Sequence, residues 1–299
     1  MRTHEQQALN AVQRPEAYRE VLLDSAGFPV ALSVWKGEPD APAVVFLPGT
    51  MTHPLFYEDF LDALNRAGFG VVGVHPAAHG KSPRVRRRPA FADLVTNASD
   101  ALAWTVRTMG APHTVLIGSS QGGILALAVA AETDLADHVF AHNALDPALP
   151  GSLDVTRAPR ALRPAYPAAR RLLALAGRLA PGVPVPIGAY LELARVSGDP
   201  AVVERFFADP LGRRSYPLGL LAGLLATPLR PARCPVTVVA GTRDRLFPLA
   251  YMRAVYERIE APAKDLLLVE SDQHLLFNED LDAVLPLLLP RLLAATAAS

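Results

Sequence analysis

A serine, an aspartate and a histidine follow one another along the chain, and these three side chains could together perform nucleophilic catalysis. Ser120 is the centre of Gly118-Ser119-Ser120-Gln121-Gly122, between an apolar run that predicts a buried strand and a stretch that predicts a helix. A serine on such a tight turn takes strained backbone angles, and the glycines on either side avoid clashes that a Cβ would cause. We therefore predict that Ser120 is a nucleophile; the alternative is a Gly-rich turn with a helix-capping serine.

A serine hydroxyl needs a base and an orienting acid, and the chain supplies both after Ser120. Asp244 lies in a loop after the predicted strand 236–240, and His274 lies after the predicted strand 265–270. In this order His274 would take the proton from Ser120, and Asp244 would fix the imidazole tautomer. Asp146, which follows an earlier strand, is the rival acid, and Asp272 is interpreted as a loop residue.

The elements that must position these residues alternate between strands and helices. Apolar runs predict buried strands at 43–47, 70–74, 113–117, 139–142, 236–240 and 265–270. Helical spacing of apolar residues predicts helices at 56–67, 91–109, 121–132, 249–259 and 281–293. Residues 18–23 and 29–35 flank a turn-forming stretch and predict a hairpin. This alternation indicates an α/β fold with a mostly parallel sheet covered on both faces.

Residues 147–233 break the alternation. They are rich in Pro, Arg, Leu and Ala, show no convincing strand, and predict helices at 168–179, 202–207 and 216–225. We interpret them as a helical cap between two parts of one core, residues 1–146 and 234–299. The leucines of the cap either pack on the core or line an apolar pocket, and we favour packing for most of Leu172, Leu173, Leu175, Leu179, Leu220, Leu221, Leu224 and Leu225.

Composition excludes several classes of function. The 29 Lys and Arg balance 29 Asp and Glu, so charge gives no reason to expect a nucleic-acid partner. Hydrophobic residues make up 51% of the chain, which permits a large core. Residues 1–10 are polar and resemble no secretory signal, and no apolar stretch reaches the roughly 18 residues of a membrane span. We therefore expect a cytoplasmic protein without a transmembrane segment, in an oligomeric state that the sequence leaves open.

Together these motifs resemble the α/β-hydrolase superfamily, in particular its serine esterases and lysophospholipases, over essentially the whole chain. The likeness covers 118–122, the acid loop 241–248 and the loop 272–274. Residues 46–50 stand where the family has its His-Gly oxyanion loop, and residues 75–82 resemble its Asp-x-x-Gly-x-Gly-x-Ser stretch. Pro48 replaces the family's His, His75 its Asp and Ala78 one of its glycines.

The resemblance implies hydrolysis of a small, apolar ester or acyl substrate through an acyl-enzyme. The backbone N–H groups of Thr50 and Gln121 would hold the oxyanion, with Met51 as the reserve donor. Ser120 argues against dehalogenases and epoxide hydrolases, which use Asp at that position. C–C bond hydrolases, thioesterases and peptidases of the same fold remain alternatives, as does a non-catalytic ligand-binding protein.

Three features of the N-terminal half have two interpretations each. His53 either touches substrate or begins a helix, and we expect no cofactor and no metal because His75 and His79 have no evident third ligand. The basic run Arg84, Arg86, Arg87 and Arg88 is either a solvated loop, which we favour, or an attraction for an anionic substrate.

Overall fold

One eight-stranded sheet organises residues 10–297, the part of the chain that the computed structural model describes. Its strand order is β1-β2-β4-β3-β5-β6-β9-β10. The strands are β1 (Tyr18–Ser25), β2 (Phe28–Trp35), β3 (Ala43–Leu47), β4 (Gly70–Val74), β5 (Thr114–Ser119), β6 (His138–His142), β9 (Val236–Gly241) and β10 (Lys264–Val269). In this sheet β1 pairs antiparallel with β2, and β2 pairs antiparallel with β4. The other five pairs of neighbouring strands are parallel. The predicted mostly parallel α/β sheet is confirmed.

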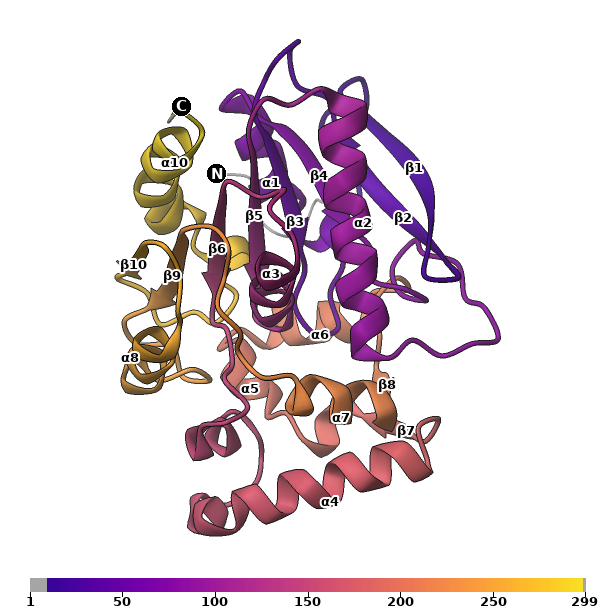
Figure 1. Ribbon diagram of the computed structural model, residues 1–299, viewed down its shortest axis with the longest axis vertical. Helices are drawn as coiled ribbons and strands as arrows, with labels where there is room; N and C mark the ends of the chain where they lie inside the picture. The colour runs from indigo at the N-terminus through magenta and orange to yellow at the C-terminus, as the bar shows by residue number, and fades with distance from the viewer. Residues whose placement is uncertain (1–9, 298–299) are drawn as a thin grey trace.

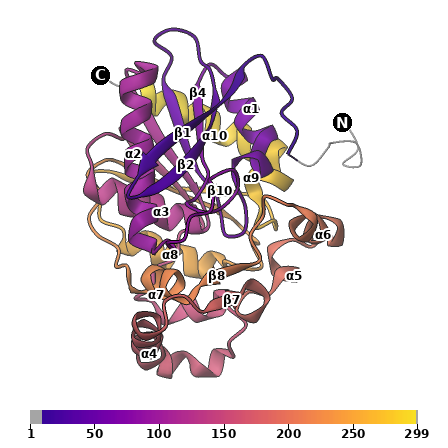
Figure 2. The ribbon, with the colours of Figure 1, turned by 90° about the vertical axis from the view of Figure 1, so that its right-hand side faces the viewer.

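Helices cover both faces of this sheet (Figures 1 and 2). One apolar cluster joins the sheet to α2 (Phe91–Met109), α3 (Gln121–Glu132) and α8 (Leu249–Arg258). A second cluster joins the other face to α1 (Glu58–Arg66), α9 (Leu276–Glu279) and α10 (Leu281–Ala297). The helix predicted at 56–67 begins with a 3₁₀ turn, Pro54–Tyr57, because a proline fits the first turn of a helix.

The chain between β6 and β9, which we call the insertion (residues 143–235), lies below the sheet in Figure 1. It holds α4 (Tyr166–Leu179), α5 (Leu193–Val196), α6 (Pro200–Ala208) and α7 (Leu218–Ala226), and α4 packs on α7. We predicted no strand here, but β7 (Pro184–Pro186) pairs with β8 (Ser215–Pro217). Strands this short and rich in proline show no alternating pattern. The division into a cap at 147–233 and two core parts stays an interpretation.

Two predictions from the sequence concern a membrane-spanning segment and a secretory signal. Among residues 10–297, no helix has both the length and the apolar character to span a bilayer. The stretch 1–10, for which we expected no secretory signal, lies almost wholly outside the described residues.

Candidate functional site

Ser120 occupies a strained turn between β5 and α3. Its φ is 54° and its ψ −112°, in a region that residues with a side chain rarely adopt. Glycine is required on both sides: a Cβ on Gly118 would collide with the backbone of Gly122, and a Cβ on Gly122 would collide with the carbonyl of Leu47. Gly118 and Gly122 thus let α3 and β3 close around the turn that presents Ser120.

Asp244 and His274 meet at the carboxyl ends of β9 and β10. The Nδ1 atom of His274 lies 3.0 Å from Oδ2 of Asp244, and both side chains are buried. The other carboxylate oxygen accepts the N–H groups of Leu246 and Phe247 at 2.7 and 2.9 Å. Burial raises the pKa of Asp244, but His274 and the Phe247 N–H outweigh it, so the pKa lies below its usual value. An ionised Asp244 orients His274 with Nδ1 protonated and Nε2 free.

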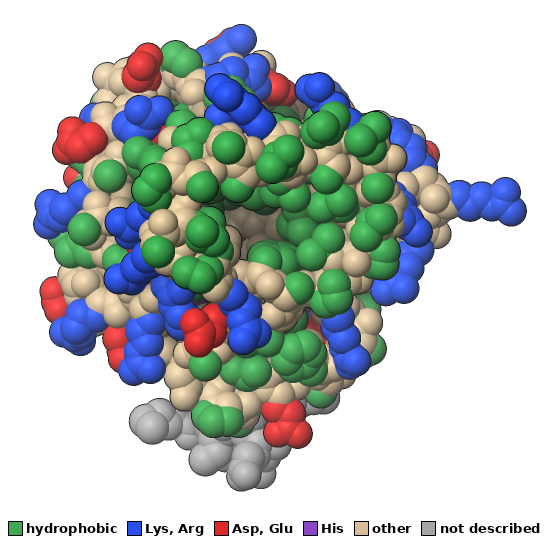
Figure 3. All heavy atoms as spheres, turned by 90° about the horizontal axis from the view of Figure 1, so that it is seen from below, with side chains coloured by type: hydrophobic (Ala, Val, Ile, Leu, Met, Phe, Trp, Pro, Cys, Tyr) green, Lys and Arg blue, Asp and Glu red, His purple; other side chains and the backbone are tan. Residues whose placement is uncertain are grey.

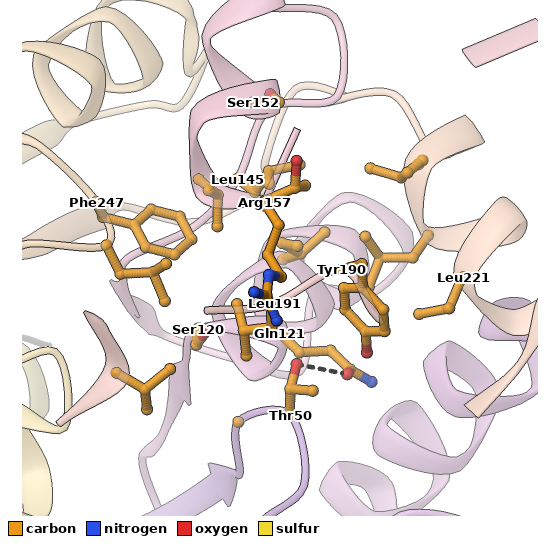
Figure 4. A pocket seen from close by; sticks show the side chains of 18 of the residues that line it. Thr50, Ser120, Gln121, Leu145, Ser152, Arg157, Tyr190, Leu191, Leu221 and Phe247 are labelled. Atoms are coloured by element: carbon orange, nitrogen blue, oxygen red, sulfur yellow. Dashed lines mark hydrogen bonds between the residues drawn. The ribbon is translucent and has the colours of Figure 1, made fainter. Parts of the chain in front are cut away.

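A cavity of about 500 Å³ connects Ser120 with His274, since both line it. Figure 3 shows the hollow from below, surrounded by hydrophobic side chains, and Figure 4 shows Ser120 and Gln121 on its floor. Phe247, which stacks on the His274 ring at 5.3 Å, belongs to the same lining. No Asp or Glu is among the lining residues, all of which lie within residues 10–297. The arrangement suits an apolar molecule with a reactive carbonyl at its polar end.

The two proposed oxyanion donors flank Ser120 on the cavity floor. The Thr50 hydroxyl donates to the side-chain oxygen of Gln121 at 3.0 Å, which ties the two loops together (Figure 4). Within residues 10–297, the backbone N–H groups of Thr50 and Gln121 have no hydrogen-bond partner. The N–H of Met51, our reserve donor, is already bonded to the Tyr216 hydroxyl at 3.0 Å. Geometry therefore favours Thr50 and Gln121 over Met51.

Sequence reasoning missed two residues beside this site, His142 and Asn143. The Asn143 amide donates to Asp244 Oδ2 at 2.7 Å and to His142 Nε2 at 2.8 Å. His142 Nδ1 lies 3.1 Å from the Ser119 hydroxyl, and the His142 carbonyl accepts the N–H of Ser120 at 2.8 Å. Burial lowers the pKa of His142 to about 3, so the ring is neutral and Nδ1 donates to Ser119.

The signal for these residues was their place at the carboxyl end of a buried strand, where polar side chains gather in this kind of fold. The Asn143 N–H donates to the carbonyl of Val239 in β9. Only this pairing of distant strands brings Asn143 to Asp244, and a local sequence pattern does not contain it.

Other candidates have different partners. Asp146, the rival acid, accepts Arg258 Nε at 2.5 Å, and Asp272 lies 3.5 Å from Arg245. His53 is buried against Asp209 at 2.7 Å and does not line the cavity. Both ring nitrogens of His75 are bonded, to Ser33 and to the Lys81 N–H. Neither Asp146 nor Asp272 orients His274.

The leucines of the insertion divide into three groups. Leu220 is buried, as packing predicts. Those in the cavity wall are Leu173, Leu221, Leu224 and Leu225. Leu172, Leu175 and Leu179 are 68%, 52% and 78% exposed along α4, so packing was wrong for these three. Gly177 of α4 lies against Ala222 of α7, whereas these three leucines are exposed, and helical periodicity alone does not distinguish the two faces. Leu220, Leu221, Leu224 and Leu225 do pack with the core cluster, the last three while also lining the cavity.

Comparison with known proteins assigns the family. Residues 38–281 match the family described as serine aminopeptidase, S33, and the chain belongs to this family of the α/β-hydrolase superfamily. By class it is a serine hydrolase.

Similar proteins include several lipases. A monoacylglycerol lipase of Mycolicibacterium smegmatis is 28% identical over 267 residues, which is 85% of this chain and 88% of that protein. The crystal structure of Paleococcus ferrophilus monoacylglycerol lipase superimposes with a TM-score of 0.68 and 22% identity, covering 90% of this chain and 99% of that one. A soluble variant of monoglyceride lipase from Saccharomyces cerevisiae, solved with a substrate analog, gives 0.70 and 14%, covering 98% and 97%. The two structures show the shared fold.

Proposed function

We propose that this protein hydrolyses carboxylic esters of the monoacylglycerol type through Ser120, His274 and Asp244. The observation that carries the proposal is that one apolar cavity is lined by both the strained Ser120 and the His274 that Asp244 orients. The resemblance to a monoacylglycerol lipase over most of both chains supports the substrate class.

The mechanism follows from the positions of these groups. His274 Nε2 takes the proton of Ser120 while the oxygen attacks the ester carbonyl, and the N–H groups of Thr50 and Gln121 receive the negative charge. His274 then protonates the departing alcohol, and a water repeats the sequence on the acyl-enzyme. Asp244 stays ionised and holds the imidazolium that forms in each half of the cycle.

The cavity favours an ester over a peptide with a free amino terminus. Recognition of an α-ammonium group needs a carboxylate, and the lining residues include none. The volume of about 500 Å³ lies in the usual range for small-molecule sites and is mostly walled by leucines and other apolar side chains. A fatty acyl chain suits such walls, and a glycerol or other small alcohol would leave from the polar floor.

The test is hydrolysis of 1-monoacylglycerols of increasing chain length by wild type and by Ser120→Ala. We expect turnover to fall by roughly 10⁴ to 10⁶ in Ser120→Ala, and a fluorophosphonate probe to label the wild type but not this variant. Ser152→Ala, which changes another serine that lines the cavity, is the matched control and should keep both activity and labelling. Near-normal hydrolysis by purified Ser120→Ala would refute the assignment, and a protein that binds esters but is never labelled would favour the ligand-binding alternative.

A further inference from the structure

The basic run at 84–88 is an exposed loop, as we favoured, but its arginines have different surroundings. Arg87 pairs with Asp93 and lies over the ring of Phe28 at 4.7 Å. Arg84 instead lines a second cavity, of about 300 Å³, formed by residues 78–84 and 210–213. One member of the run therefore belongs to a hollow that the proposed hydrolysis does not use.

This second cavity gathers positive charge. Lys81, Arg84 and Arg213 line it, and no Asp or Glu does among the described residues. Lys81 also pairs with Glu20, and the Arg213 guanidinium donates to the carbonyls of Ala78 and Ser215, both at 2.8 Å. No hydrogen-bond or ion-pair partner of Arg84 exists within residues 10–297. Some N–H groups of these three side chains thus have no acceptor in this part of the chain, and little negative charge balances them.

The charges are also close enough to disturb one another. Burial lowers the pKa of Arg213, Tyr216 partly opposes this, and the neighbouring Arg84 and Arg88 lower the pKa further. Like charges in a partly desolvated place repel each other strongly. A bound anion would remove that repulsion, and guanidinium groups match the oxygens of phosphate in geometry as well as in charge.

A neutral histidine completes the lining. His79 is only 4% exposed, and burial lowers its pKa to about 3. Its Nε2 donates to the carbonyl of Met51 at 3.1 Å, and its Nδ1 has no partner among the described residues. The N–H of Arg213 donates to the same Met51 carbonyl at 3.1 Å. The second cavity therefore lies directly behind the loop that carries Thr50.

We propose that this second cavity is a binding site for a phosphate-type oxyanion. Lys81, Arg84 and Arg213 donate to its oxygens. The volume of about 300 Å³ leaves room for an organic substituent on the phosphate, so the ligand is inorganic phosphate or a phosphate monoester. The site stands apart from Ser120, and its existence does not depend on the proposed ester hydrolysis.

Isothermal titration calorimetry of the full chain at constant ionic strength tests the proposal. We expect saturable binding of inorganic phosphate, weakened about tenfold or more by Arg84→Gln, which removes a charge-assisted donor without breaking a hydrogen bond or ion pair among the described residues. Arg86→Gln takes the same charge from the same run outside the cavity, and it should bind like wild type. Lys81→Gln is the second variant, with a similar expected loss.

Two further probes identify the source of the anion. Tighter binding of glycerol 3-phosphate than of phosphate would assign a soluble monoester, and retention only on phosphatidate vesicles, lost in Arg84→Gln, would assign a lipid headgroup. The proposal is overturned if none of the three probes binds, or if Arg84→Gln, shown to be folded by circular dichroism, binds them as wild type does.

Discussion

The floor and the walls of the large cavity come from different parts of the chain and are held in different ways. The floor is built by loops at the carboxyl ends of the sheet strands. Hydrogen bonds through His142, Asn143 and Asp244 join Ser120 to His274, and Gln121 accepts the Thr50 hydroxyl. The walls come largely from the insertion and are mostly apolar side chains, with Arg157 and Arg170 among them. Several hydrogen bonds thus fix the positions of the floor residues, while the wall residues tolerate changes of size and shape.

This contrast separates reactivity from selectivity. A change on the floor should slow every substrate alike, because it alters the groups at the reacting carbonyl. A change in a wall should alter the order of preference among acyl chains and leave the shortest ester untouched. The following predictions test that separation, from the largest expected effect to the smallest.

After the loss expected when the proposed nucleophile is removed in Ser120→Ala, the largest effect is expected for Asp244→Asn. The amide would remove the negative charge beside His274 and favour the wrong imidazole tautomer, so kcat should fall by about 10⁴ for short and long esters equally. Steady-state kinetics on a chain-length series measures both the size and the uniformity of the loss. Asp272→Asn is the matched control, because Asp272 is near in sequence but pairs with Arg245. A loss confined to long esters would contradict the separation.

We expect acid to destabilise the protein through the buried histidines of its core. The insertion contains no histidine and so does not contribute to this effect. Burial lowers the pKa of His75, His79 and His142 below the usual value, to about 3 for the latter two. The unfolded chain then binds more protons, so stability is greatest above pH 6.5 and falls as pH drops, by up to about 2 kcal/mol for each histidine at pH 5. Glu58 and Glu279, whose pKa burial raises, partly offset the loss.

Urea unfolding between pH 8 and pH 5 measures this dependence. His75→Gln should lower the stability at pH 8 and flatten the slope, because one fewer proton is taken up on unfolding. A free energy of unfolding that stays constant over this range would mean that these histidines are not buried in neutral form.

A wall residue should act on selectivity. Leu221 of α7 lines the cavity (Figure 4). Leu221→Ala removes apolar contact with a long acyl chain, so kcat/KM should fall about tenfold for long monoacylglycerols. Hydrolysis of an acetyl ester should be unchanged. An equal fall for acetyl and long-chain esters would show that the walls also position the floor.

The smallest effect is expected for Leu175→Ser on α4. This leucine is 52% exposed and does not line the cavity. Its replacement should change the free energy of unfolding by no more than about 0.5 kcal/mol and leave hydrolysis of soluble esters unaltered. Thermal unfolding and the same chain-length series provide the measurement. The contrasting variant is Leu220→Ala, at a buried position of the insertion, which should destabilise the protein by about 2 kcal/mol or more.

Local patterns in the sequence determined the elements of the core. Runs of apolar residues gave the parallel strands, and the glycines at 118 and 122 marked the turn at Ser120, because strand burial and backbone strain are consequences of neighbouring residues. The order of Ser120, Asp244 and His274 also predicted which of the many polar residues to consider. The structure brings Asp244 and His274 within 3.0 Å of each other.

Only the tertiary structure decided what depends on contacts between distant segments. The pairing of β6 with β9 carries Asn143 to Asp244, and the packing of α4 on α7 decides which leucines line the cavity and which face outward. Likewise, Arg84 and Arg213 are far apart in the chain and meet in one basic cavity. Periodicity shows which face of a helix or strand is apolar, but it does not identify the element that packs on that face. The turn at Ser120 was therefore predictable from the sequence, whereas the residues that surround it were not.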